Sequence, residues 1–290
     1  MREGKYIDTV IEEGVFRQLR TLSHTRERIV RYNTGSKHAL KAVLDDYFPE
    51  LKGAFWSMKS KGLWALLGTY PFPEDVLQAG LPAITELLAK STKRKAHARE
   101  KAEIICQAAR ESVGLKTIGN ADRMRLGVYL DEVKRSEERL KEIEHEITDL
   151  LRQVPLAEHI LSIPGIGAVT CGVFLGELGN PEYFKEPRQI VKYTGYDPKE
   201  NDSGLRTGRK IISKKGRWLL RKYLYFMAMR VVHRSVFFKE YYENKQKGSL
   251  RPLEKKEALC AVVIKLIRVI FALMRDRRMF TEEIRCAQAA

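Results

Sequence analysis

The chain has 290 residues, and its 53 lysines and arginines outnumber 37 aspartates and glutamates, which gives a formal net charge of +16. Hydrophobic residues make up 44% of the sequence, enough to bury a core, so wholesale disorder is excluded. The positive charge predicts a polyanionic partner, and nucleic acid is favoured over a membrane because no uninterrupted apolar run is long enough to span a bilayer.

Cysteine and histidine are scattered rather than clustered. The six histidines are dispersed, and no CxxC pair joins any of the four cysteines, Cys106, Cys171, Cys260 and Cys286. The opening "MREGKYIDTV" lacks the apolar core of a signal peptide. These features predict a reduced, cytoplasmic protein with no structural zinc and no metal site.

The N-terminal part of the sequence predicts helices. Apolar residues recur at helical spacing over residues 15–47, although "YNTGS" at 32–36 weakens the middle of this helix. Glycine and proline punctuate shorter helices after it, and a further helix is predicted to begin at Pro82, since proline suits the first helical turn. The basic run "KSTKRKAHAREK" that follows is interpreted as a solvated helix face.

Residues 124–154 carry the strongest periodicity in the sequence. Five apolar residues are spaced seven apart: Leu126, Val133, Leu140, Ile147 and Val154. A second, mostly apolar set of residues occupies the complementary heptad positions, and charged residues fill the remaining faces. This pattern predicts a coiled-coil arm. The arm can pair with another chain or fold back on the first long helix, and the pattern allows both. Ser136 is a polar residue in the seam and is expected to help set the register.

A proline-glycine turn, "PGIG", separates two predicted helices, "LAEHILSI" and "AVTCGVFLGELG". Glycine permits positive φ and leaves the backbone uncovered, so amide groups at the start of the second helix can approach an anion. Gly165 and Gly167 therefore predict a helix-hairpin-helix contact to the DNA backbone, which would position the protein without reading sequence. The alternative is a tight helix-to-helix turn that needs glycine for packing alone.

A segment rich in basic residues follows. Between Ser203 and Lys222 lie eight basic residues and no acidic one, and such a run repels itself unless an anion covers it. We predict DNA contacts for six of them: Arg206, Arg209, Lys210, Lys214, Lys215 and Arg217. The part up to Gly216 is predicted to be a turn-rich loop or ribbon, and "RWLLRKYLYFMAMRVV" a helix. Trp218, at the head of that helix, is interpreted as a core residue rather than as one that stacks on a base.

The remaining sequence predicts two more helices, "VFFKEYYENKQKGSL" and "PLEKKEALCAVVIKLIRVIFALMRDRR", and Lys265 and Arg268 argue against a membrane span in the second. We expect an all-α or nearly all-α protein, with an extended helical, coiled-coil arm followed by a compact helical domain that contains a helix-hairpin-helix-like motif. The expected divisions are a helical segment at 1–60, a helical region with the arm at 61–153, a DNA-binding domain at 154–275 and a tail at 276–290.

Three ordered blocks carry a resemblance to a known family. "LSIPGIGAVTCGVFLGELGNPEYF", "IVKYTGYDPKENDSG" and "ISKKGRWLLRKYLYFMAM" resemble the C-terminal domain of insertion-sequence transposases, a family that includes bridge-RNA-guided recombinases and Piv-type DNA invertases. In that family a RuvC-like domain precedes the coiled-coil arm and the C-terminal transposase domain. A looser likeness begins at residue 12, so that the resemblance covers most of residues 12–275.

The resemblance implies an activity and a nucleophile. In the family a serine of the last domain attacks the scissile phosphate, while four acidic residues of the RuvC-like domain hold divalent metal. The family's Ser-Gly motif corresponds to Ser203 and Gly204, beside arginines and lysines that would neutralise the phosphate. Without the family, "NDSG" would be interpreted as an ordinary polar turn.

The sequence departs from the family pattern at its start, where the acidic domain should already have ended. We therefore expect an N-terminally truncated transposase that is incomplete alone, with no cofactor in this chain and Mg²⁺ only with the acidic domain. The expected partners are DNA and either further copies of the chain or an intact transposase, and a guide RNA stays an open alternative. The expected location is the prokaryotic cytoplasm, at the nucleoid. The alternative function is a non-catalytic DNA-binding or coiled-coil interaction fragment.

Overall fold

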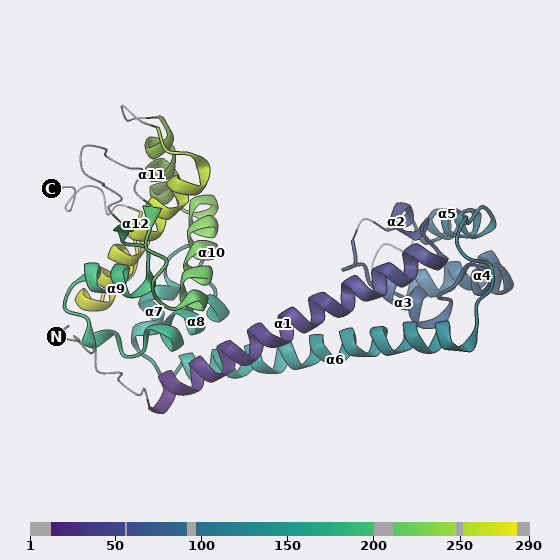
Figure 1. Ribbon diagram of the computed structural model, residues 1–290, viewed down its shortest axis with the longest axis horizontal. Helices are drawn as coiled ribbons and strands as arrows, with labels where there is room; N and C mark the ends of the chain where they lie inside the picture. The colour runs from purple at the N-terminus through teal and green to yellow at the C-terminus, as the bar shows by residue number, and fades with distance from the viewer. Residues whose placement is uncertain (1–12, 56, 92–96, 200–210, 248–251, 283–290) are drawn as a thin grey trace, which may run out of the picture. The chain divides into compact units, whose positions relative to one another are not determined.

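The computed structural model describes residues 13–55, 57–91, 97–199, 211–247 and 252–282. They form two compact units, and each is described by itself. The C-terminal unit comprises the described residues up to Glu27 together with those from Lys141 onward, and the middle unit spans Arg28–Leu140. Two long helices, α1 (Gly14–Tyr47) and α6 (Asn120–Leu151), contribute residues to both units (Figure 1).

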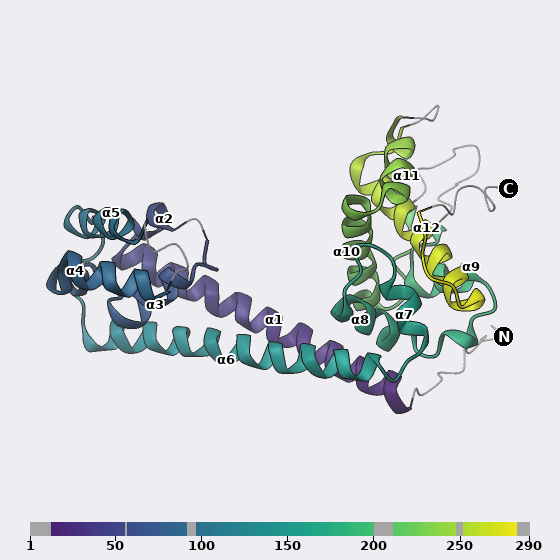
Figure 2. The ribbon, with the colours of Figure 1, turned by 180° about the vertical axis from the view of Figure 1, so that it is seen from behind.

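Helices α1 and α6 lie side by side and run antiparallel (Figures 1 and 2). In the middle unit, Tyr32 and Ser36 of α1 donate hydrogen bonds to the Glu132 carboxylate of α6, at 2.7 and 2.8 Å. Lys37, the residue after Ser36, forms an ion pair of 2.7 Å with Glu137 of α6. The predicted arm therefore folds back on the first long helix, which is one of the two pairings that the sequence allowed.

The same pairing continues in the C-terminal unit. Leu19 of α1 and Ile147 of α6 are fully buried in one hydrophobic cluster. Arg26 donates to one carboxylate oxygen of Glu144 from Nε and Nη2, at 2.9 and 2.6 Å. Ile147, one residue of the predicted heptad seam, thus shares a core with α1 within the chain.

The seam between α1 and α6 contains polar residues where it passes through the middle unit. Asn33, Ser36 and Ser136 are each at most 7% exposed. Among the described residues, the Oδ1 atom of Asn33 has no hydrogen-bond partner. Buried polar groups of this kind lower stability but can fix the register of paired helices, the role predicted for Ser136. The "YNTGS" stretch does not interrupt α1, which is continuous through it.

Further helices of the middle unit enclose a second core: α2 (Leu51–Ala54), α3 (Lys61–Thr69), α4 (Pro73–Ser91) and α5 (Ala98–Arg110). Phe48, Leu66 and Ile84 are at its centre and have no exposed surface. Helix α4 is kinked at Gly80, whose φ is +73°. Pro82 lies in the first turn after the kink, so the predicted helix start there is confirmed.

The C-terminal unit is built from short helices around a larger core: α7 (Leu156–Leu161), α8 (Ala168–Leu178), the 3₁₀ helix η2 (Pro181–Tyr183), α9 (Pro187–Thr194), α10 (Trp218–Arg234), α11 (Val236–Lys247) and α12 (Lys255–Asp276). Its strands, β1 (Pro198–Lys199) and β2 (Ile211–Ile212), have two residues each and pair antiparallel. The described chain is therefore nearly all-α, as predicted.

Helix α8 is the innermost element of this unit, buried from Thr170 to Leu178. Glycines allow its neighbours to approach it. A Cβ atom at Gly176 would lie within 2.9 Å of three backbone atoms of Leu19 and Arg20 on α1, and one at Gly172 would overlap the Ile147 side chain on α6. The small residues in "CGVFLGEL" thus let α1 and α6 pack directly on α8.

The units divide the chain differently from the expected domains. The expected boundaries lay near residues 60 and 153, whereas the observed boundaries cross α1 after Glu27 and α6 after Leu140. The physical reason is that α1 and α6 each contribute one end to the core of the middle unit and the other end to the core of the C-terminal unit. Phe280, in the expected tail, packs on Phe238 with ring centroids 6.0 Å apart. None of the helices in the described ranges is both long and apolar enough to cross a membrane.

The buried Asn33 gives a test of the seam. We expect Asn33→Leu to raise the free energy of unfolding by about 1 kcal/mol, because the substitution removes a buried carbonyl oxygen that lacks a partner and adds apolar contact. Thr34→Leu, on the exposed side of the same helix, is the matched control and should change stability by less than about 0.5 kcal/mol. Urea denaturation measures both. A loss of stability in Asn33→Leu would show that the asparagine is satisfied in solution.

Candidate nucleic-acid interface

The candidate site surrounds the two short strands. We use "loop base" for residues 195–198 and 212–216, which flank the predicted Ser-Gly segment. Pro198 lies opposite Ile212 in the strand pair. The Ser213 amide donates to the Asp197 carbonyl oxygen at 2.9 Å, and the Ser213 hydroxyl donates to Asp197 Oδ1 at 2.5 Å. The two sides of the loop base are therefore fixed to each other by backbone and side-chain bonds.

Two glycines let the halves of the loop base interlock. Gly195 has a φ of +76°, and a Cβ atom there would overlap the carbonyl oxygen of Lys215. A Cβ atom at Gly216 would overlap the carbonyl oxygen of Tyr193. The Lys214 amide donates a hydrogen bond to the Gly195 carbonyl oxygen at 3.1 Å. Lys214 itself has a φ of +54°, which is uncommon for a residue with a Cβ atom. The close backbone approach requires glycine at both positions.

Helices on both sides anchor the loop base. The Tyr196 side chain is buried, and its hydroxyl donates to the carbonyl oxygen of Arg221 on α10 at 3.0 Å. In return, Arg221 Nη1 donates to the carbonyl oxygen of Thr194 at the end of α9, at 3.2 Å. These reciprocal bonds join the C-terminus of α9 to the first turn of α10. The segment between the strands consequently leaves from a rigid frame.

The predicted DNA-binding cations that the structure describes fall into two groups. Lys214 and Lys215 are exposed on the loop base, and no ion pair between either lysine and another described residue is found. Arg217 instead donates to the carbonyl oxygen of Glu177 at 2.7 Å and lies 5.3 Å from the centre of the Tyr193 ring. Arg217 therefore satisfies the C-terminal end of α8, where a cation is favourable.

The two glycines of "PGIG" have different surroundings. Gly165 has a φ of +98°, and a Cβ atom there would lie 2.9 Å from the carbonyl oxygen of Arg230 on α10. Gly167 is exposed, has a φ of −105°, and has open space around its missing side chain. Its amide donates to the Thr170 hydroxyl at 3.1 Å. Packing alone accounts for Gly165, and only Gly167 lies where an anion could approach the start of α8.

Ser203, with Gly204, lies outside the described residues, as do three of the predicted DNA contacts, Arg206, Arg209 and Lys210. Two other side chains of a type that can act as a nucleophile, those of Cys171 and Tyr223, are buried. Burial raises the pKa of the Cys171 thiol to about 12. Burial also raises the pKa of Tyr223, whose hydroxyl accepts a hydrogen bond from Arg26 at 2.7 Å. Neither group is suited to attack a phosphate.

Two carboxylates near the loop base, those of Glu177 and Asp197, already bond to other side chains of the C-terminal unit. Glu177 is 1% exposed, and its Oε1 lies 2.7 Å from His24 Nε2 and 3.7 Å from Arg20 Nε. Asp197 is occupied by Ser213. In the ranges that the structure describes, no group of three or more histidine, cysteine, aspartate or glutamate side chains is arranged to hold a metal ion.

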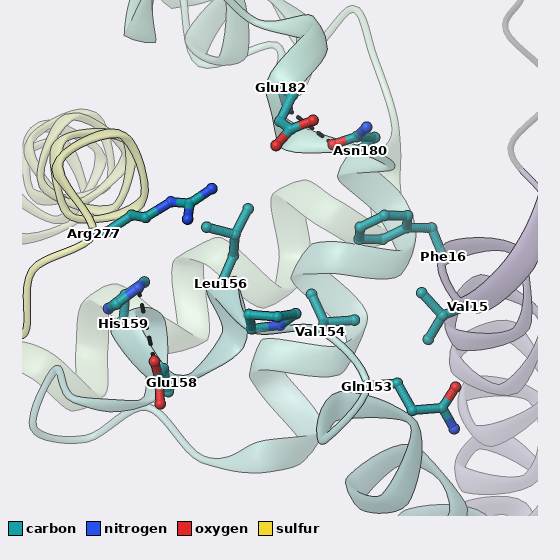
Figure 3. Close-up of a pocket in the computed structure, with 11 residues that line it drawn as sticks. Val15, Phe16, Gln153, Val154, Leu156, Glu158, His159, Asn180, Glu182 and Arg277 are labelled. Atoms are coloured by element: carbon teal, nitrogen blue, oxygen red, sulfur yellow. Dashed lines mark hydrogen bonds and ion pairs between the residues drawn. The ribbon is translucent and has the colours of Figure 1, made fainter.

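A separate hollow of about 540 Å³ lies in the same unit (Figure 3). Its lining combines the apolar side chains of Phe16, Val154 and Leu156 with the charged side chains of Glu182 and Arg277 (Figure 3). Its lining includes none of the residues predicted to act on DNA. The hollow is therefore distinct from the loop base.

One aromatic side chain that the sequence predicts to be buried is exposed. Trp218 was interpreted as core, but 43% of it is exposed, because the first turn of α10 directs Leu219 and Leu220 into the interior instead. Further along the helix, Phe226 and Met229 are 42% and 40% exposed. The spacing of these three residues at 218, 226 and 229 could have identified a shared helix face.

One family of known proteins matches part of the C-terminal unit in sequence. Residues 157–243 match the family described as "Transposase IS116/IS110/IS902 family". This range begins in α7 and ends in α11, so it contains the "PGIG" turn, the whole loop base and α10.

Similar proteins come from mobile elements and from a DNA-inversion system. The chain is 26% identical over 263 residues to the insertion element IS116 uncharacterized 44.8 kDa protein of Streptomyces clavuligerus, covering 91% of this chain and 65% of that protein. It is 26% identical over 161 residues to the pilin gene-inverting protein of Moraxella bovis, covering 53% and 49%. It is also 26% identical over 145 residues to the transposase for insertion sequence element IS1328 of Yersinia enterocolitica, covering 50% and 43%. The chain thus spans less than two thirds of each of these relatives.

The different surroundings of the two turn glycines predict different costs of substitution. We expect Gly165→Ala to lower the free energy of unfolding by about 2 kcal/mol, because the φ is positive and the new Cβ would meet the Arg230 carbonyl. Gly167→Ala should cost less than about 1 kcal/mol, since its φ is allowed and the space is open. Urea denaturation of both variants gives the comparison, and equal losses would contradict the packing role of Gly165.

Proposed function

We propose, on the premise that residues 157–243 have the fold of the IS116/IS110/IS902 transposase family, that this chain acts in DNA transposition or site-specific recombination. In this proposal the C-terminal unit binds DNA, and Ser203 is the nucleophile for strand cleavage and rejoining. The observation that carries the proposal is the loop base. It is a rigid, glycine-interlocked frame with two exposed lysines, and the Ser-Gly segment begins and ends on it.

The proposed chemistry balances as a phosphoryl transfer. The Ser203 hydroxyl oxygen forms a bond to phosphorus, the bond from phosphorus to one deoxyribose oxygen breaks, and a base accepts the serine proton while the leaving oxygen is protonated. A phosphoserine link between the protein and one DNA end results. Attack by a hydroxyl from another strand reverses the step and joins the new pair of ends. Cationic side chains stabilise the charge on the phosphate oxygens during both steps.

A serine hydroxyl needs a base or a metal to react at neutral pH. The carboxylates near the loop base are already bonded to His24 and Ser213, so we propose that the activating groups come from an acidic, metal-binding domain of the kind that precedes this region in the family. On this view Mg²⁺ acts only with that domain, and the present chain binds DNA without cutting it.

Electrostatic contact should dominate DNA binding. Each phosphate contact changes the slope of log affinity against log salt by about −0.9 on duplex DNA. Lys214→Gln with Lys215→Gln should therefore make the slope shallower by about 2 and weaken binding to all sequences alike. Lys255→Gln with Lys256→Gln removes an equally exposed adjacent pair at the start of α12 and is the matched control. Fluorescence anisotropy at several salt concentrations measures both slopes, and equal changes in the two variants would remove the loop base from the interface.

The nucleophile is tested by a covalent adduct. Supplied with the acidic domain of a related intact transposase and Mg²⁺, the chain should form a protein–DNA link that survives denaturing electrophoresis. Ser203→Ala should abolish the link while changing DNA affinity by only a few fold, since a hydroxyl contributes at most one neutral hydrogen bond, about 1 kcal/mol. An adduct in Ser203→Ala would place the nucleophile elsewhere. An adduct formed by the present chain alone would contradict the need for the acidic domain.

The alternative is a non-catalytic fragment that binds DNA or interacts through its coiled coil. The intramolecular pairing of α1 with α6 weighs against the second form, because Ile147, Glu144 and Glu132 of α6 already share a core with α1 or accept hydrogen bonds from it within the chain. Binding without any adduct, even with the acidic domain present, would favour the non-catalytic function.

A further inference from the structure

We propose that the exposed face of α10 is a stacking platform for unpaired DNA bases, separate from the phosphate contacts of the loop base. This inference rests on the proposed DNA-binding function and names the form of DNA that this face recognises. Its basis is a row of large apolar side chains on a helix that is otherwise basic. Trp218, Phe226 and Met229 are 43%, 42% and 40% exposed.

The three side chains share one face of the helix. At 100° per residue, positions 218, 222, 226, 229 and 233 fall within about 80° of one another around the axis. The opposite face supplies core residues such as Leu220, Leu224 and Val231. The exposed row therefore does not result from a helix that is apolar on every side. It is a solvent-facing row of apolar side chains that alternate with Lys222 and His233.

The neighbouring groups hold the platform in place. Tyr223 packs edge-to-face on Phe226, with ring centroids 6.1 Å apart. Lys222 lies between Trp218 and Phe226 along the helix, with its ammonium 5.8 Å from the centre of the Phe226 ring and 2.6 Å from the buried carboxylate of Glu27. Fixed aromatic rings lose little freedom when a flat ligand stacks on them.

The charge of α10 favours a polyanion over a protein. Its sequence, "WLLRKYLYFMAMRVVHR", contains no acidic residue, and Arg230, His233 and Arg234 are exposed. Aromatic side chains that alternate with cations are the usual surface for single-stranded nucleic acid, because every base offers a π face and every nucleotide a phosphate. In a duplex the bases already stack on one another, so exposed rings gain little from it.

The spacing of the rings fits a short run of nucleotides. From position 218 to position 226 the helix rises about 12 Å, and stacked bases along one strand are about 3.4 Å apart. The face therefore spans about three to four nucleotides. Its first residue, Trp218, is two positions beyond the end of the loop base in sequence, so unpaired bases on α10 would continue from phosphates held at Lys214 and Lys215.

The test compares two DNA forms in the full chain. Binding of a labelled oligothymidine of about 12 nucleotides and of a duplex of equal length is measured by fluorescence anisotropy. In Trp218→Leu with Phe226→Leu, which keeps both side chains apolar but removes the rings, single-strand affinity should fall at least tenfold, since base–aromatic stacking contributes that much. Duplex affinity should change less than about twofold. The salt slope should stay the same for both forms, because no phosphate contact is removed.

Two controls keep the result specific. Tyr183→Leu removes an aromatic residue that is 60% exposed on a different element of the same unit, and it should leave both affinities unchanged. Trp218→Phe retains a ring and should keep single-strand affinity within about threefold. Matching thermal unfolding of the leucine variant and the parent chain shows that the fold is retained.

The possible results separate the two proposals. Binding to neither DNA form would overturn the proposed function and this inference with it. Equal losses on single strand and duplex, or no loss in the leucine variant, would overturn the platform alone. So would a concentration-dependent dimer in sedimentation that the leucine variant abolishes without any change in DNA binding, because the face would then be an interface between copies of the chain.

Discussion

Backbone approaches that leave no room for a Cβ atom hold the C-terminal unit together. Gly176 brings α8 against the backbone of α1, and Gly165 brings the preceding turn against α10. Gly195 and Gly216 lock the two halves of the loop base in the same way. In each case the absence of a side chain on glycine allows two main-chain segments to contact each other directly. Such contacts can hold even short helices and strands in fixed positions. The positions of the exposed lysines and of the α10 face depend on these contacts.

Much of the fold could be predicted from the sequence, because local periodicity is enough to identify a helix. The heptad in α6 and the nearly all-α class follow from the spacing of apolar residues, and the helix start at Pro82 follows from the preference of proline for a first helical turn. The partner of the coiled-coil helix could not be predicted, since a heptad presents the same apolar row to a second chain or to α1. The domain boundaries also differed, because paired helices cross between cores and no change of composition marks the point.

The candidate site was harder to predict, because neighbouring residues of one type have different partners in space. Gly165 and Gly167 are two positions apart, but only the first faces another backbone. Lys215 and Arg217 belong to one basic run, although Arg217 is bonded to the end of α8. The basic run predicts a negatively charged partner. Which of its cationic side chains are exposed to contact that partner is determined by the tertiary structure. In the same way, the sequence does not show that Trp218, an apolar residue beside buried Leu219 and Leu220, is exposed.

The loop base has a consequence for how such a protein can diversify. Its two sides are joined by their own hydrogen bonds, so the eleven residues from 200 to 210 close a loop whose ends are already fixed. Loop-closure entropy grows only with the logarithm of length, and doubling the number of residues costs about 0.6 kcal/mol. Insertions there would leave the unit stable. A longer or shorter segment between residues 199 and 211 is therefore compatible with the same supporting helices.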